Sequence, residues 1–275
     1  MTRSGTGATV EPHGIVTGED GTPLAYRRSG TGPPLLLLHG TSADHRRWQP
    51  VLPAFEQHFT VYNLDRRGRG GSGDVEPYAL EAEFADVIAV VEAIGEPVDV
   101  IGHSYGGLCA LEAAPRLATK LRKLVVYEPP MNVTEVPLAG PDTIDRLEAY
   151  LATDDREGLV AAMMTELVGV GPEALARMRS LPPWQGRVAA APTIPRELRA
   201  VYDYRFDPVR FLEIATPTLL LLGGESPENV KAATHAIAAA LPNAQTVVLP
   251  GQGHVAMDSA PDLFVAEVLR FLSDD

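Results

Sequence analysis

The chain has 275 residues, of which 45% are hydrophobic, so it can bury the core of one large domain. Its formal net charge of −13 argues against nucleic acids and anionic membrane surfaces as partners. A single cysteine, Cys109, excludes an intrachain disulfide framework, and no apolar run reaches the length of a membrane span. Because no signal-peptide pattern follows Arg3, we expect a cytoplasmic protein.

The order of apolar and turn segments predicts an α/β fold. Residues 15–16 and 24–26 flank the turn at 18–21 and predict an N-terminal hairpin. Residues 79–94 repeat apolar side chains at helical spacing as far as Gly95, and later helices are expected at 232–241 and 262–272. Uninterrupted apolar runs, which are typical of strands covered on both faces, occur at 35–38, 61–64, 98–101, 124–127, 218–222 and 246–249. This alternation predicts a mostly parallel central sheet flanked by helices.

One interval, residues 130–214, contains no convincing strand. Helical stretches at 144–151, 159–168 and 173–178 are followed by a proline-rich stretch at 182–184. About 85 residues is too long for an ordinary connection, so we expect a helical lid inserted into a core domain formed by residues 1–129 and 215–275. Most of its apolar side chains should pack the lid and a few should face a cleft; they include Met131, Met163, Met164, Leu167, Trp184, Tyr202 and Phe206.

The segment Gly102-His103-Ser104-Tyr105-Gly106 carries the strongest functional signal. It lies between a predicted strand and a helix-compatible run, which is the context in which Gly-x-Ser-x-Gly presents a nucleophilic serine. Glycines on both sides remove the Cβ atoms that would clash in so tight a turn. We therefore expect the hydroxyl of Ser104 at the carboxyl end of the sheet.

A serine hydroxyl needs a general base, and the base needs an orienting carboxylate. His103 lies inside the turn and cannot reach back to its neighbour's Oγ, and His39 ends a strand beside Gly40. His254 instead follows the last strand and precedes a helix, which places it on a loop where open α/β sheets bind ligands. We expect His254 to be the base.

Together these features resemble the α/β-hydrolase superfamily over nearly the whole chain. The hairpin, His39-Gly40-Thr41 after a strand, the Asp65 to Ser72 turn, the Gly-x-Ser-x-Gly segment, the lid and the Gly253-His254 loop all fit this resemblance. It implies that the backbone N–H groups of Thr41 and Tyr105 form an oxyanion hole, where fixed dipoles stabilise the charge on the attacked carbonyl oxygen. His39 is expected to hold the loop together.

Two glutamates compete for the role of the acid. Most relatives place an aspartate in a turn after the penultimate strand, but here Ser226 occupies that position and Glu225 is one residue away. Glu128 ends the strand that follows the nucleophile's helix, where a subgroup resembling haloalkane dehalogenases has its catalytic glutamate. A carboxylate at the end of a buried strand also needs a partner. We favour Glu128 and keep Glu225 as the alternative.

Other motifs predict no metal site and no cofactor. No cysteine pair or histidine cluster has metal-ligand spacing, and neither glycine-rich patch reads as a dinucleotide-binding fingerprint. Arg66, Arg67 and Arg69 could suggest an anion site, but we expect a solvated turn shaped by Gly68 and Gly70.

The expected activity is that of a serine hydrolase. Ser104 would attack an ester, thioester or lactone of a small to medium hydrophobic substrate, with His254 as base. Serine at this position argues against epoxide hydrolase and haloalkane dehalogenase chemistry, which need an aspartate there. Two alternatives stay open: a tailoring enzyme (a cyclase, a lyase or a carbon–carbon bond hydrolase) that uses His254 as base, and a non-catalytic ligand-binding receptor. Association between copies of the chain is also left open.

Overall fold

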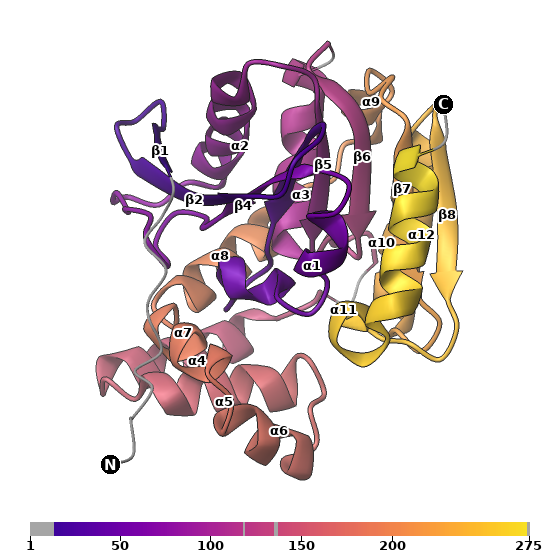
Figure 1. The fold of residues 1–275 in the computed structure, drawn as a ribbon. Helices are drawn as coiled ribbons and strands as arrows, with labels where there is room; N and C mark the ends of the chain where they lie inside the picture. The colour runs from indigo at the N-terminus through magenta and orange to yellow at the C-terminus, as the bar shows by residue number, and fades with distance from the viewer. Residues whose placement is uncertain (1–13, 118, 135–136, 274–275) are drawn as a thin grey trace, which may run out of the picture.

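The computed structural model describes residues 14–117, 119–134 and 137–273. An eight-stranded sheet forms the centre of the molecule, in the order β1-β2-β4-β3-β5-β6-β7-β8 (Figure 1). The strands are β1 (Gly14–Thr17), β2 (Pro23–Ser29), β3 (Pro34–Leu38), β4 (Thr60–Leu64), β5 (Val98–His103), β6 (Leu121–Tyr127), β7 (Thr218–Gly223) and β8 (Ala244–Leu249). β1 and β2 are the antiparallel hairpin that the Asp-Gly turn predicts, and β3 to β8 pair in parallel.

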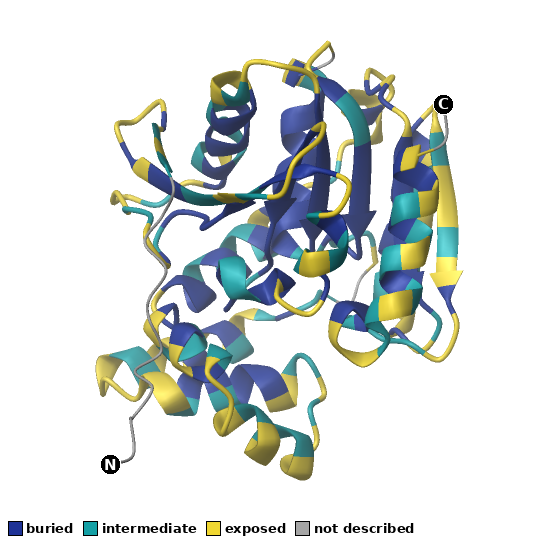
Figure 2. Cartoon of the chain, viewed as in Figure 1, coloured by how far each residue is buried: buried dark blue, intermediate teal, exposed yellow. Residues whose placement is uncertain are grey.

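Helices cover both faces of the sheet, which explains the continuous apolar runs of the central strands. One core joins alternate strand residues to α2 (Leu80–Ile94), α3 (Tyr105–Ala113) and α10 (Glu228–Ala240). The other joins the intervening residues to η1 (His45–Trp48), α1 (Leu52–Phe55), α11 (Ala256–Ser259) and α12 (Pro261–Ser273). The short η2 (Ala114–Leu117) follows α3 directly. Figure 2 shows the central strands as the most deeply buried part of the molecule. The expectation of a mostly parallel sheet flanked by helices is confirmed.

The segment between β6 and β7 is helical, and we call it the helical segment. It contains α4 (Pro141–Ala152), α5 (Arg156–Glu166), α6 (Pro172–Arg179), α7 (Pro183–Ala189), α8 (Thr193–Asp203) and α9 (Pro208–Phe211). Helices α4 to α8 enclose a hydrophobic cluster of their own, which includes Ile144, Leu159 and Trp184. In Figure 1 helices α4 to α6 lie beyond the carboxyl ends of the parallel strands.

The proline-rich stretch is more ordered than the sequence indicates. Pro183 is the first residue of α7, a position where proline is favoured because its missing N–H has no partner there in any case. Helix α8 follows after a short connection and buries Ile194, Glu197 and Leu198. Because of the prolines at their starts, the sequence did not predict helices α7 and α8.

The turn of three arginines connects the helical segment to the core, and the expectation that it is solvated is wrong. Arg66 is 2% exposed and forms a bidentate pair with Glu83 and a bond of 2.7 Å to Glu197 of α8. Arg69 also binds Glu197. An anion site is equally disfavoured because these guanidinium groups already face carboxylates.

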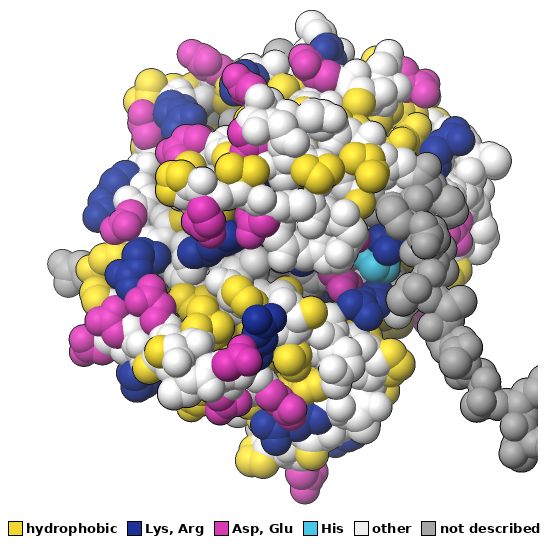
Figure 3. Space-filling model, turned by 90° about the vertical axis from the view of Figure 1, so that its left-hand side faces the viewer, with side chains coloured by type: hydrophobic (Ala, Val, Ile, Leu, Met, Phe, Trp, Pro, Cys, Tyr) yellow, Lys and Arg dark blue, Asp and Glu magenta, His cyan; other side chains and the backbone are white. Residues whose placement is uncertain are grey.

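Arg67 completes the arginine turn on the core side. It binds Asp86 of α2 in a bidentate pair of 2.7 and 2.8 Å and reaches Asp20 at 2.9 Å. The exposed faces look different: Figure 3 shows positive and negative side chains interspersed on one of them. Among the described residues, no helix is long and apolar enough to cross a membrane.

Glu197 provides a test of this buried network. Burial opposes its ionisation, but Arg66 and Arg69 outweigh burial and hold the pKa of Glu197 well below its ordinary value of 4.5. Glu197→Gln should lower the free energy of unfolding by about 3 kcal/mol, because two buried cations lose a counter-charge. Chemical denaturation at pH 7 measures this loss.

The matched control is Glu148→Gln in α4, which removes an exposed partner of Arg199 and should cost less than about 1 kcal/mol. The Glu197 carboxylate stabilises the fold only while it is ionised. The gap between the wild type and Glu197→Gln should therefore narrow as pH falls below 4.5. Equal small losses from both variants would contradict the role of Glu197.

Candidate active site

Ser104 lies at the junction of β5 and α3 in a strained conformation. Its φ and ψ are 53° and −125°, a region that non-glycine residues rarely adopt. The turn requires glycine two residues before and two residues after Ser104: a Cβ on Gly102 would lie 2.6 Å from the Gly106 carbonyl oxygen, and a Cβ on Gly106 would lie 2.4 Å from the Leu38 carbonyl oxygen. The Ser104 N–H donates to the Tyr127 carbonyl at 2.8 Å and fixes the turn against β6.

His254 meets Glu128 at the carboxyl end of the sheet. Nδ1 of His254 lies 2.6 Å from Oε2 of Glu128, whose side chain is completely buried. When Glu128 accepts this hydrogen bond, Nδ1 of His254 carries the proton and Nε2 is left without one. The sequence analysis favoured this pairing, and the structure brings these two residues together.

The second oxygen of Glu128 is also satisfied. Oε1 accepts hydrogen bonds from the Gly223 N–H at 2.7 Å and from the Ser226 hydroxyl at 2.5 Å. Glu128 has a φ of 47°, in the left-handed region, so the chain bends at the end of β6 to present the carboxylate. Ser226, at the position of the expected aspartate, thus binds Glu128, a contact that the sequence did not reveal.

Glu225 lies apart from this constellation. Its side chain is exposed, and its backbone N–H donates to the Gln252 carbonyl at 2.8 Å. Its place in the turn after β7 therefore contributes a main-chain contact, while the adjacent Ser226 points to Glu128.

Two side chains, those of His103 and Tyr127, hold the loop that carries His254. His103 donates from Nε2 to the His254 carbonyl at 2.8 Å, and the Tyr127 hydroxyl donates to the Gly253 carbonyl. The rings of His103 and His254 have centroids 4.7 Å apart. Burial, followed by the nearby His254 and Arg47, holds the pKa of His103 well below its usual value, so His103 is neutral.

The loop after β3 carries Thr41, which lines the same cavity as Ser104. His39 is completely buried; Nδ1 bonds the Gly40 carbonyl at 2.9 Å, and Nε2 accepts the Arg66 N–H at 3.1 Å. Burial, with Arg66 and Arg69 nearby, lowers the pKa of His39, so the ring is neutral with its proton on Nδ1. Because a trans peptide directs C=O and N–H in opposite directions, holding the Gly40 carbonyl also aims the Thr41 N–H.

The second N–H of the expected pair belongs to Tyr105. It is the first residue of α3, and the first N–H groups of a helix have no partner within that helix. The loop approaches this helix start closely, since a Cβ on Gly40 would lie 2.8 Å from Ser104 Cβ. The geometry thus allows both N–H groups to serve one oxygen beside Ser104.

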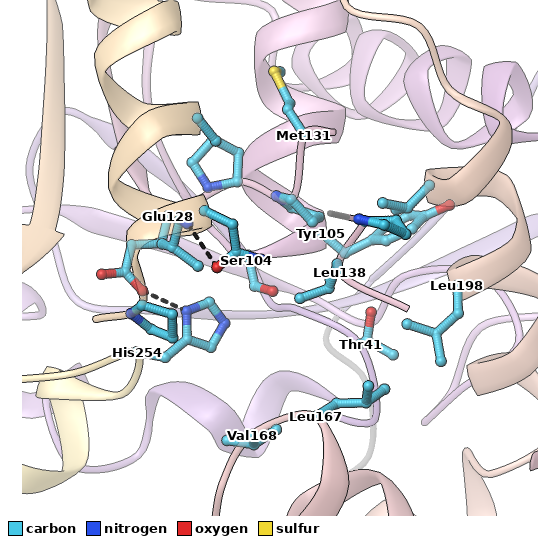
Figure 4. Close-up of a pocket in the computed structure, with 18 of the residues that line it drawn as sticks. Thr41, Ser104, Tyr105, Glu128, Met131, Leu138, Leu167, Val168, Leu198 and His254 are labelled. Carbon is cyan, nitrogen blue, oxygen red and sulfur yellow. Dashed lines mark hydrogen bonds and ion pairs between the residues drawn. The ribbon is translucent and has the colours of Figure 1, made fainter. Parts of the chain in front are cut away.

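A cavity of about 370 Å³ opens above these residues. Thr41, Ser104, Tyr105, Glu128 and His254 line one side, and Figure 4 shows Ser104 and His254 beside apolar side chains. The apolar lining comes largely from residues 130–214 and includes Met131, Leu138, Met163, Leu167, Val168, Leu198 and Val201. Of the apolar residues named from the sequence, Met131, Met163 and Leu167 line the cavity, whereas Met164 and Trp184 pack inside the helical segment.

One group of potential metal ligands occurs among the described residues, formed by Asp44, His45 and Asp65. Its oxygens already bind cationic groups or ring nitrogens. Asp44 pairs with Arg46, and Asp65 binds Arg27 at 2.8 Å and His45 Nδ1 at 2.7 Å. We assign no metal to this group.

Comparisons with known proteins agree with the fold and the reaction class. A model of the Alpha/beta hydrolase family matches residues 35–267. An alpha/beta hydrolase from Sphaerobacter thermophilus is 38% identical with a TM-score of 0.82, over 94% of this chain and 100% of that chain. The 2-(acetamidomethylene)succinate hydrolase of Mesorhizobium japonicum is 24% identical over 90% of this chain and 91% of its own length. An esterase from a Rhodococcus species is 23% identical with a TM-score of 0.76, over 94% of this chain and 98% of that chain, and shares the fold. Hydrolysis is the reaction class that these matches support, and the chain belongs to the alpha/beta hydrolase family.

Proposed function

We propose that the chain is a cofactor-independent serine hydrolase that cleaves an ester, thioester or lactone through an acyl-enzyme. The observation that carries this proposal is the bond of 2.6 Å between His254 Nδ1 and the buried Glu128, in the same cavity as Ser104. Glu128 fixes the tautomer in which Nε2 faces the cavity as a base. Ser104, His254 and Glu128 would then be the catalytic residues.

The proposed reaction has two halves. His254 Nε2 takes the Ser104 proton as Oγ attacks the carbonyl carbon, and the oxygen that becomes negative accepts hydrogen bonds from the Thr41 and Tyr105 N–H groups. Each such donor is worth about 3 kcal/mol in the transition state. The protonated His254 then gives its proton to the leaving group, and the acyl group stays on Ser104. Water, deprotonated by His254, releases the acid and restores the serine.

The cavity supports a neutral, mainly apolar substrate of small to medium size. Its volume of about 370 Å³ lies in the lower part of the range of small-molecule sites. Among the described residues that line it, none is lysine or arginine. Because residues 130–214 supply most of the apolar wall, we propose that they act as the lid and select the substrate.

Ser104→Ala should lower the hydrolysis of p-nitrophenyl butyrate by at least about 10³-fold, because the covalent route is lost. Release of p-nitrophenol, followed at 405 nm, measures the rate. Ser180→Ala, at an exposed position of the helical segment, is the matched control and should retain wild-type turnover. Wild-type turnover in Ser104→Ala would overturn the serine-hydrolase proposal.

Replacing the two candidate acids separates their roles. Glu128→Gln should reduce kcat by about 10³- to 10⁴-fold with little change in KM, because Nδ1 no longer has a carboxylate to fix its tautomer. Glu225→Gln should be nearly silent, because its side chain is exposed. Steady-state kinetics of both variants decide the assignment. The reverse pattern would move the acid to the turn after β7, and mild effects from both would favour a lyase or a receptor.

A further inference from the structure

Helix α7 reaches the loop that carries one of the two proposed oxyanion donors. Arg187 donates from Nη1 to the Ser42 carbonyl at 3.2 Å and to the Ser42 hydroxyl at 3.0 Å. Ser42 directly follows Thr41 and is completely buried. The contact joins residues 145 positions apart, so it connects the helical segment to the loop after β3.

Ser42 is held in a conformation that it would not adopt alone. Its φ is 57°, in the left-handed region, which is unfavourable for a serine. Such a residue persists only when its surroundings fix it. On one side of Thr41, His39 binds the Gly40 carbonyl at 2.9 Å. On the other side, Arg187 binds the carbonyl and the hydroxyl of Ser42. The peptide that carries the Thr41 N–H is therefore held on both sides.

Arg187 differs from the other arginines that connect the helical segment to the core. Arg66 and Arg69 bind Glu197, and Arg196 binds Asp74 and Glu76. Among the described residues, no carboxylate forms an ion pair with Arg187. Burial and the nearby Arg47 lower the pKa of Arg187 to about 10, so this cation is kept in an unfavourable environment. Its hydrogen bonds go to the dipoles of one loop residue.

We propose that Arg187 is a positioning residue that holds the loop after β3 so that the Thr41 N–H points at the developing oxyanion. On this view the helical segment completes the catalytic machinery in addition to lining the cavity. The inference rests on the proposed function, because it assigns a role in the same reaction. Its distinctive consequence is a loss of transition-state binding with little loss of substrate binding.

The test compares Arg187→Met with the wild type on p-nitrophenyl butyrate. We expect kcat to fall by about 10- to 100-fold, which is somewhat less than the fall expected when an oxyanion-hole N–H donor is removed altogether. KM should change by less than about 2-fold. A trifluoromethyl ketone, whose carbonyl carbon accepts Ser104 Oγ and places a negative oxygen at the same site, supplies a second readout. Its inhibition constant should rise by about the same factor as kcat/KM falls.

Arg196→Met is the matched control, because Arg196 also links the helical segment to the core but binds Asp74 and Glu76 instead of Ser42. It should leave kcat and the inhibition constant within about 2-fold of the wild type. Equal losses of kcat in both variants would mean that Arg187 only attaches the helical segment to the core, and would overturn the inference. A second ester, p-nitrophenyl hemisuccinate, carries a carboxylate that Arg187 could bind directly. A rise in KM alone, or a loss of activity seen only with this anionic ester, would assign Arg187 to substrate binding and would also overturn the inference.

Ser42→Ala keeps the test decisive if Arg187→Met does not fold. It removes one of the two acceptors of Arg187 and should lower kcat by only a few fold, because the Ser42 carbonyl still accepts from Arg187. Where Arg187→Met does fold, adding Ser42→Ala to it should cause little further loss of kcat, because Arg187 is already absent. An unchanged kcat in Ser42→Ala would contradict the inference. A wild type that hydrolyses none of these esters would instead defeat the proposed function itself.

Discussion

The buried carboxylate of Glu128 is the constraint on which the rest of the site depends. An ionised group with no exposed surface is stable only when each oxygen has a partner. His254 Nδ1 serves one oxygen, and the Gly223 N–H and Ser226 hydroxyl serve the other. His254 lies on the loop after β8, Gly223 is the last residue of β7, and Ser226 lies in the turn after β7. Pairing of β6 with β7 and of β7 with β8 therefore brings Glu128 and His254 together.

The position of Ser104 depends on the carboxyl ends of the same central strands. Ser104 directly follows β5, which pairs with β6, and its N–H donates to the carbonyl of Tyr127, the residue before Glu128. Both of these adjacent strand ends are strained, since Ser104 and Glu128 have positive φ. The packed cores on the two faces of the sheet supply the stability that maintains such conformations. The geometry of the proposed site is thus a property of the parallel sheet as much as of its loops.

The sequence predicted those parts of the structure that depend on local pattern. The parallel strands, the turn at Ser104 and the helix ending at Gly95 follow from apolar runs and glycine positions. The partnership of His254 with Glu128 required a resemblance, because local pattern alone does not identify residues that meet in space. The expectation of a solvated arginine turn was wrong for the same reason, because Arg66 binds Glu197, which lies 131 residues away in the sequence. Helices α7 and α8 were not predicted because prolines stand at their starts. The sequence showed Ser226 only as a serine at the position of the expected aspartate and did not predict its hydrogen bond to Glu128.

Reaction with a fluorophosphonate tests the central claim most directly, because the reagent bonds to a serine only when that serine is activated as a nucleophile. Intact mass spectrometry after incubation should show a single adduct on the wild-type chain, and peptide mapping should place it on Ser104. Ser104→Ala should gain no adduct, and Glu128→Gln should react far more slowly. A wild-type chain that stays unlabelled, or that carries the adduct on another residue, would contradict the account.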